Sequence, residues 1–260
     1  MPPKQTGVYL GMTAPEHTPD GYKLIRGTPT WLVALVLNAQ RPGIFRSKEN
    51  RQALQSALRN HFSRNEPRLP SFQATNSFYP LSGKGSEIEA QYKWGQSSGQ
   101  KLRISYSREL PNLEKSYIEN AIRASLPTGV SVEFPVINRN ESSWLDNFLE
   151  MKNLDGRIQL VDIGGHMMNA AISMMFCSKL GVRFPDSSGR ICDLVAKAKS
   201  SDSVVSDDYE MQFNSILKDE AEVIPLFSTG IFWLYSDDID PKSISSIPLD
   251  PRFDLLRLRP

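Results

Sequence analysis

The longest uninterrupted apolar run in this 260-residue chain covers residues 31–37, and it limits the folds that the chain can adopt. A run of this length is too short for a membrane-spanning helix, which needs about 20 apolar residues, and it suits a buried strand. A helical stripe follows soon after. Ser47 precedes residues 48–62, in which Ala53, Leu54, Ala57, Leu58 and Phe62 recur at helical spacing. A buried strand followed by an amphipathic helix is typical of an α/β protein.

Strand and helix patterns continue to alternate along the chain. Residues 102–106 alternate as on a strand, 117–126 carry an apolar helical stripe, and 130–136 alternate again, which predicts a parallel crossover. Further strands are expected at 157–163 and 231–235, and further helices from Ser143, around 193–199 and from Asp207. The helix from Asp207 is expected to bury Met211 and to end at Pro225. The remaining tail, rich in proline, is expected to be extended.

Charge and cysteine content narrow the possible functions. The chain has 30 basic and 29 acidic residues, and this balance argues against a dedicated nucleic-acid surface, which needs clustered Lys and Arg. Its two cysteines, Cys177 and Cys192, are too few for a disulfide-rich scaffold, and their spacing matches no zinc motif. They are either two buried thiols or one disulfide.

Catalytic signatures are missing from the sequence. There is no Walker-type phosphate loop, no Gly-x-Ser-x-Gly elbow and no His-Glu-x-x-His zinc helix. The three histidines are His17, His61 and His166, and the position of His61 near a helix end is explained by the helix dipole alone. The sequence therefore predicts a protein that is not an enzyme and that needs no cofactor or metal.

One segment has the pattern of a ligand-binding edge. Asp162 ends a predicted strand, Gly164 and Gly165 follow as a turn, and His166 comes next. Ligands in open α/β sheets lie beyond the carboxyl ends of strands, and glycines let the backbone approach them closely. The alternative is a tight turn with His166 on its surface. Trp94, in a polar and irregular stretch, either covers part of a pocket or caps that stretch.

Three stretches, in this order, carry a family resemblance. A strand ending in Asn38 is followed by Arg51-Gln52-Ala53-Leu54, Gly129 precedes a second strand after a long helix, and residues 216–227 form a closing helix that runs into Ile224-Pro225-Leu226. Together they resemble the bacterial extracellular solute-binding proteins of family 5, which serve peptide and nickel ABC importers. The resemblance extends from about Tyr22 to the end of the chain.

The resemblance implies a fold and a setting. It implies lobe II of a two-lobe receptor, with a mixed, largely parallel sheet flanked by helices. Residues 1–27 would be a hinge segment, 28–236 the lobe, and 237–260 a return toward lobe I. The expected partners are a small-molecule or peptide ligand, the importer's membrane subunits and the N-terminal lobe, which lies outside this chain. The expected location is periplasmic or extracytoplasmic, and lipid anchoring of the full-length protein is one option.

The resemblance also assigns residues. It places Asp162, Gly164, Gly165, His166 and Asn169 at the ligand, with Trp94 as a further candidate. Peptide binders of the family have Gly-Trp followed by an Asp that pairs with the peptide's amino group. Here the Trp is absent and His166 or Asn169 stands in the place of the acids, so an ordinary peptide is not expected and the ligand stays open. The resemblance also implies a disulfide between Cys177 and Cys192.

Two other functions remain open at the level of sequence. The same fold occurs as the sensor domain of cytoplasmic transcriptional regulators, where it lies behind a DNA-binding domain. A third option is a metal-binding protein that uses His166.

Overall fold

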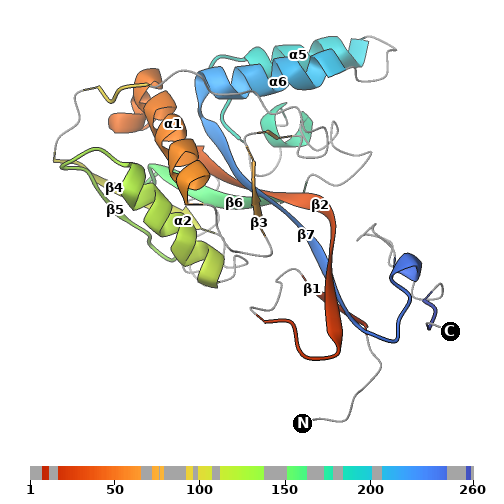
Figure 1. Cartoon of the computed structure of the whole chain (residues 1–260). Coiled ribbons are helices and arrows are strands. Elements are labelled where there is room, and N and C mark those ends of the chain that lie inside the picture. The colour runs from red at the N-terminus through yellow and green to blue at the C-terminus, as the bar shows by residue number, and fades with distance from the viewer. Residues whose placement is uncertain are drawn as a thin grey trace.

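The structure is a computed structural model of the chain. It describes residues 8–11, 17–65, 72–75, 77–78, 92–95, 99–106, 112–137, 151–162, 173–177, 184–200, 207–244 and 256–258. Within these ranges a mixed sheet is flanked by helices, which confirms the predicted α/β class (Figure 1). In the same ranges, no helix combines the length and the apolar character that a membrane crossing requires.

Two long antiparallel strands, β2 (Tyr22–Leu37) and β7 (Val223–Ser236), form the centre of the sheet. The sheet order is β1-β7-β2-β6-β4-β5, and β3 also pairs with β7. The shorter strands are β1 (Val8–Gly11), β3 (Phe72–Ala74), β4 (Lys101–Tyr106), β5 (Ser131–Glu133) and β6 (Gly156–Asp162).

The helices cover both faces of this sheet. One face packs against α1 (Lys48–Arg64) and α2 (Asn112–Ser125), and the other packs against α5 (Arg190–Ser200), α6 (Asp207–Glu220) and the π-helical turn η3 (Ser173–Cys177). Successive side chains of β2 point to opposite faces of the sheet. One set packs in the α1–α2 core and comprises Val33, Leu35 and Leu37. The other packs in the α5–α6 core and comprises Leu32, Ala34 and Val36. The apolar run is therefore a strand buried on both sides, as predicted.

The expectation of a largely parallel sheet is wrong. β4 pairs in parallel with β5 and β6, and α2 supplies the crossover that the β4–β5 connection needs. The other pairings are antiparallel, between β2 and β6, β2 and β7, β1 and β7, and β3 and β7. At the end of β2, the N–H of Leu37 donates to the carbonyl of Glu222, just before β7, at 2.7 Å. The first residues of β7 therefore lie beside the last residues of β2, and the two strands run in opposite directions.

Several predicted boundaries are confirmed and others are corrected. α1 begins at Lys48, and the Ser47 hydroxyl accepts the N–H of Asn50 as an N-cap. α6 begins at Asp207 as predicted, but Met211 on that helix is half exposed. Pro225 does not end this helix. It lies within β7 opposite Ala34, beside a register shift that accommodates a residue without an N–H.

The described part of the tail turns back instead of remaining extended. The short helix η4 (Pro241–Ser243) follows β7, and Ile239 forms an antiparallel bridge with Leu258. The N–H of Asp240 donates to the Arg257 carbonyl at 2.8 Å, which ties the two parts of the tail together. This backbone pairing was not foreseen because it joins residues that are far apart in the sequence.

Candidate functional site

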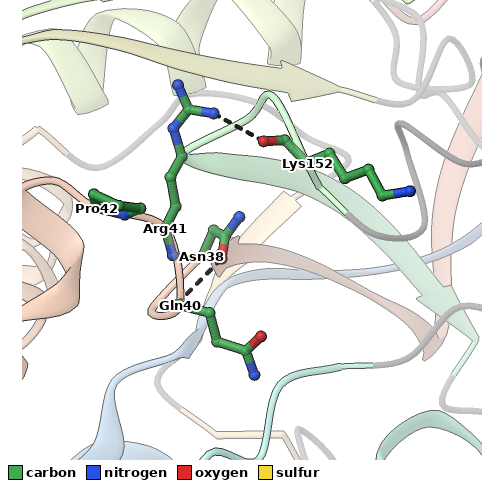
Figure 2. A pocket seen from close by; sticks show the side chains of 5 residues that line it. All are labelled: Asn38, Gln40, Arg41, Pro42 and Lys152. Atoms are coloured by element: carbon green, nitrogen blue, oxygen red, sulfur yellow. Dashed lines mark hydrogen bonds between the residues drawn. The ribbon is translucent and has the colours of Figure 1, made fainter.

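A polar hollow of about 400 Å³ lies at the end of β2, where Asn38 follows the strand (Figure 2). Its other lining residues are Gln40, Arg41, Pro42 and Lys152. The Nδ2 group of Asn38 donates to the carbonyls of Met151 and Leu154 at 2.9 and 3.0 Å, while its Oδ1 accepts the N–H groups of Gln40 and Arg41. The Asn38 side chain is therefore fully used in joining two turns.

The other groups around the hollow do not converge on a common point. The Arg41 guanidinium donates to the Lys152 carbonyl at 2.9 Å and pairs with Asp155 at 3.0 Å. Figure 2 shows the Gln40 amide and the Lys152 amine pointing away from each other and from Arg41. A ligand pocket needs a few polar groups that converge on one place. This hollow is better explained as the surface of a structural junction.

A buried ionic junction lies at the same end of the sheet. Arg51, which is 4% exposed, donates from Nε to the Glu220 carbonyl at 2.9 Å and from an Nη to the Phe45 carbonyl at 3.0 Å. Its guanidinium also lies 3.9 Å from the carboxylates of Glu220 and Glu222. Burial lowers the pKa of Arg51, although these neighbouring carboxylates favour the charged form. Arg51 therefore caps the carboxyl end of α6 with a positive charge.

Residues from both helical layers reinforce this junction. The Gln52 side chain from α1 donates to the Asp219 carbonyl at 2.8 Å, and Lys48 pairs with the Asp219 carboxylate at 2.9 Å. Hydrogen bonding from Lys48 is the largest cause that lowers the pKa of Asp219. Arg190 from α5, on the opposite face, pairs with both Asp219 and Glu220. Two of the stretches that carry the family resemblance thus pack against each other, in a structural role.

The predicted ligand edge lies at the other end of β6. Asp162 is opposite Trp31, whereas Gly156 at the start of β6 is opposite Leu37. Six residue steps along the strand separate these two ends by roughly 20 Å. Gly164, Gly165, His166 and Asn169 lie outside the described residues, so the structure places only the first residue of the predicted group.

Trp94, the further candidate for the ligand site, lies near the start of α1. It is partly buried against the α1–α2 core, and the N–H of the next residue, Gly95, donates to Asn50 Oδ1 at 2.8 Å. Asn50 lies in the first turn of α1, close to the ionic junction. This position agrees with the alternative in which Trp94 caps the irregular stretch around it.

Cys177 and Cys192 form a disulfide that joins η3 to the first turn of α5, with their Cα atoms 5.4 Å apart. Both cysteines pack against the α5–α6 core, where the rings of Phe176 and Phe184 lie 5.2 Å apart. Asp186 caps α5 by accepting the N–H groups of Ile191 and Cys192. The segment between the two cysteines is therefore held at several described points.

A polar group within the sheet, formed by Ser105, Arg157 and Gln159, was not predicted from the sequence. Ser105 and Arg157 are both fully buried and pair in register across the parallel strands β4 and β6. Burial lowers the pKa of Arg157 to about 10, and its guanidinium lies 5.9 Å from the Phe184 ring centroid. The signal in the sequence was the period-two placement of Arg157 and Gln159 within an apolar strand. Among the described residues, no group of three or more His, Cys, Asp or Glu could hold a metal ion.

No protein-family model matches this sequence, and no curated protein has significant sequence similarity to it. Solved structures do match its fold. The chain superposes on NikA from Brucella suis, in complex with Fe(III)-EDTA, with a TM-score of 0.68 and 14% identity, over 97% of this chain and 57% of that one. It superposes on a dipeptide-binding protein from Pseudoalteromonas, in complex with Met-Leu, with a TM-score of 0.65 and 16% identity, over 93% and 51%.

A third match is the periplasmic binding protein DppA from Helicobacter pylori, in complex with the peptide STSA. Its TM-score is 0.63 and its identity 13%, over 92% of this chain and 49% of that one. The chain therefore spans about half the length of the binding proteins that it matches. Its fold is that of half a periplasmic binding protein.

Proposed function

We propose that this chain is the ligand-binding lobe II of a solute-binding protein that serves an ABC importer. The observation that carries this proposal is the superposition of nearly the whole chain on half of proteins that bind Fe(III)-EDTA, Met-Leu or the peptide STSA. The lobe would hold a peptide or another small solute without chemical change, and the importer's membrane subunits would receive it. The other half of the ligand's contacts would come from an N-terminal lobe.

The pairing of β2 with β7 supports a division of the chain near residue 27. The register of this pair shifts between Arg26 and Pro29 and again between Pro29 and Trp31. Irregular pairing of this kind bends a strand and weakens its ladder locally. Residues 1–27 are proposed as the hinge segment, 28–236 as the lobe, and 237–260 as the return toward the partner lobe.

The ligand side is proposed to lie at Asp162, Gly164, Gly165, His166 and Asn169, at the carboxyl end of β6. The opposite end of β6 is occupied by the ionic junction and by Asn38, whose side chain is already fully bonded. The disulfide between Cys177 and Cys192 supports a periplasmic or extracytoplasmic location, since disulfides persist in oxidising compartments. It weighs against the cytoplasmic sensor domain.

Titration calorimetry with Met-Leu, the peptide STSA and Fe(III)-EDTA tests this proposal, and mass spectrometry checks that each solute is recovered unchanged. We expect weak, saturable binding of at least one, because half of the contacts must offset nearly the whole association entropy. His166→Ala should weaken that binding about tenfold, whereas Gln40→Ala at the polar hollow should not change it.

Three results would contradict this proposal. Chemical conversion of a solute would indicate an enzyme. Nanomolar affinity would indicate a complete receptor instead of a half-site. Specific DNA binding with no solute binding would indicate the regulator.

A further inference from the structure

Trp31 lies at the corner of the sheet where β6 stops and β2 continues. Its partners in register are Asp162, the last residue of β6, and Thr229 on β7. Toward its N-terminal end, β2 goes on pairing with β7, and within the described ranges no strand pairs with it there on the β6 side (Figure 1). Trp31 is therefore the direct neighbour of the first residue of the proposed ligand edge.

The burial of β2 changes abruptly at Trp31. Residues 32–37 are all 0% exposed, whereas Trp31 is only partly buried. Alternation places Trp31 on the same face as Val33, but among the described residues it belongs to neither of the two core clusters. The indole ring is thus reachable from solvent, and the packing of the two cores does not account for it.

A bulge directly precedes Trp31. Pro29 pairs with Gly230 and Trp31 pairs with Thr229, so two steps along β2 correspond to one step along β7. Bulges of this kind bend a strand and re-aim the neighbouring side chain, and they are frequent next to functional sites. From Trp31 to Leu37 the ladder with β6 continues without a shift, so the backbone of Trp31 is held by a regular scaffold.

A partly exposed aromatic side chain at this corner suits a half-site. In the proposed function, the N-terminal lobe supplies the other half of the ligand's contacts, so contact residues of this lobe are open to solvent until a solute is enclosed. Binding sites are lined mainly by hydrophobic and aromatic side chains. An indole ring offers a large apolar surface and a single N–H donor, which favours an apolar group as its partner.

We propose that Trp31 is a specificity-determining contact of the ligand site, against which an apolar side chain of the solute packs. This inference rests on the proposed solute-binding function and adds to it a preference for solutes with an apolar side chain. The contact lies on the α1–α2 side of the sheet, at the strand end beside Asp162.

Met-Leu and Gly-Gly are suitable probes, because they have the same charged ends and differ only in their side chains. Ligand-observed NMR with the full chain should show that Met-Leu binds at least tenfold more tightly. Trp31→Ala should reduce this preference to about twofold or less, because it removes apolar surface that only Met-Leu uses. The inference is overturned if Met-Leu shows no saturable binding, if the two dipeptides bind equally, or if Trp31→Ala keeps the full preference.

Trp31→Phe gives a second readout that does not depend on the folding of Trp31→Ala. It keeps an aromatic ring and should retain most of the preference for Met-Leu. In the unmodified protein, Met-Leu should reduce the quenching of tryptophan fluorescence by iodide, because it covers the Trp31 ring. This reduction should be absent in Trp31→Phe. A reduction of the same size in both proteins would show that another tryptophan is covered and would overturn the contact.

Tyr9→Ala is the matched control. Tyr9 is also an exposed aromatic residue of the same sheet, 52% exposed, but it lies on β1 opposite Leu234. Its removal should leave the ratio of the Met-Leu and Gly-Gly affinities unchanged. If the ratio falls as much as in Trp31→Ala, Met-Leu adsorbs to exposed aromatic rings in general and the proposed contact is wrong.

The results also distinguish this contact from the proposed function. If STSA or Fe(III)-EDTA binds and His166→Ala weakens that binding, while Trp31→Ala keeps the dipeptide preference, the solute-binding function stands and the contact is lost. If Met-Leu covers Trp31 but is recovered cleaved, the contact stands and the non-catalytic function is lost.

Discussion

The two ends of strand β6 are secured in different ways. At the Gly156 end, the Asn38 amide joins two turns, and Arg51 and Arg190 tie both helical layers to the end of α6. At the Asp162 end, the described pairing consists of the backbone ladder with β2. The polar group of Ser105, Arg157 and Gln159 lies between the two ends, and Ser105 is in register with Arg157, one residue from Gly156. Side-chain bonds to both helical layers secure the first end, whereas at the second end the described residues show backbone pairing.

This difference suggests that residues at one end of β6 stabilise the fold and that residues at the other end bind the ligand. Groups that already satisfy one another have little to offer a ligand, because a new contact would have to replace an existing one. Groups held by a rigid scaffold but left unsatisfied gain from a ligand. We therefore expect substitutions at the Gly156 end to change stability and those at the Asp162 end to change binding.

The largest expected effect is that of Arg51→Met. It removes the charge that caps α6 and leaves the 2%-exposed Glu222 without its cation. We expect the free energy of unfolding to fall by about 3–5 kcal/mol, which urea denaturation would measure. Lys48→Met, at a far more exposed pair, should cost less than about 1 kcal/mol. If the two variants lose the same free energy of unfolding, the buried ion pair contributes no more to stability than the exposed one.

Removal of the disulfide should have the next largest effect. The double variant Cys177→Ser with Cys192→Ser should lose about 3 kcal/mol, because the unfolded chain regains the freedom of a closed loop of 15 residues. The circular dichroism melting curve with and without a reducing agent gives the same comparison in the unmodified protein. If reduction leaves the melting temperature unchanged, the surrounding packing already holds η3 to α5 without the bond.

Asn38→Ala should cost about 2–3 kcal/mol. It leaves the carbonyls of Met151 and Leu154 and the N–H groups of Gln40 and Arg41 without the amide that now joins them. Urea denaturation measures the loss, and Gln40→Ala should stay within about 0.5 kcal/mol of the unmodified protein. Solute binding should not change in either variant. Loss of binding in Asn38→Ala at a temperature where the protein remains folded would place a ligand at the polar hollow.

The smallest expected effect concerns acid stability. The pKa of Asp219 is lowered in the folded protein by hydrogen bonds from Lys48 and Arg190, so its contribution is fully present above the unfolded value of 3.8. This contribution is lost as the pH falls through the lower folded value. Asp219→Asn should therefore reduce the dependence of stability on pH below about pH 4, and high salt should shrink the difference. An unchanged pH profile would mean that these exposed pairs contribute nothing measurable.

Local patterns predicted much of the fold correctly. The apolar run at 31–37, the Ser47 cap and the helical stripe after Lys48 depend on neighbours within a few residues, and the structure has the expected strand and helix. The same is true of α2, β6 and the start of α6. For the candidate site, the sequence indicated the strand that leads to it and its last residue, Asp162.

The failures concern residues whose neighbours are distant in the sequence. Pro225 was predicted to end a helix, but pairing with β2 places it inside a strand. Trp94 was grouped with Asp162 on sequence alone, and the structure packs it against the α1–α2 core, where the next residue, Gly95, bonds to Asn50. Ser105 and Arg157 are about 50 residues apart, and only the parallel register of β4 and β6 makes them neighbours.

The sequence by itself determined the α/β class, most of the element positions and the separation of two core faces along β2, because apolar periodicity is a local property of the chain. Tertiary structure decided the antiparallel centre of the sheet, the bonding of Asn38 and Arg51 within the protein, and the enclosure of Ser105 beside Arg157. The physical reason is that a hydrogen bond or an ion pair depends on which groups meet and on how far water is excluded from them. Both depend on contacts between segments that the order of residues does not specify.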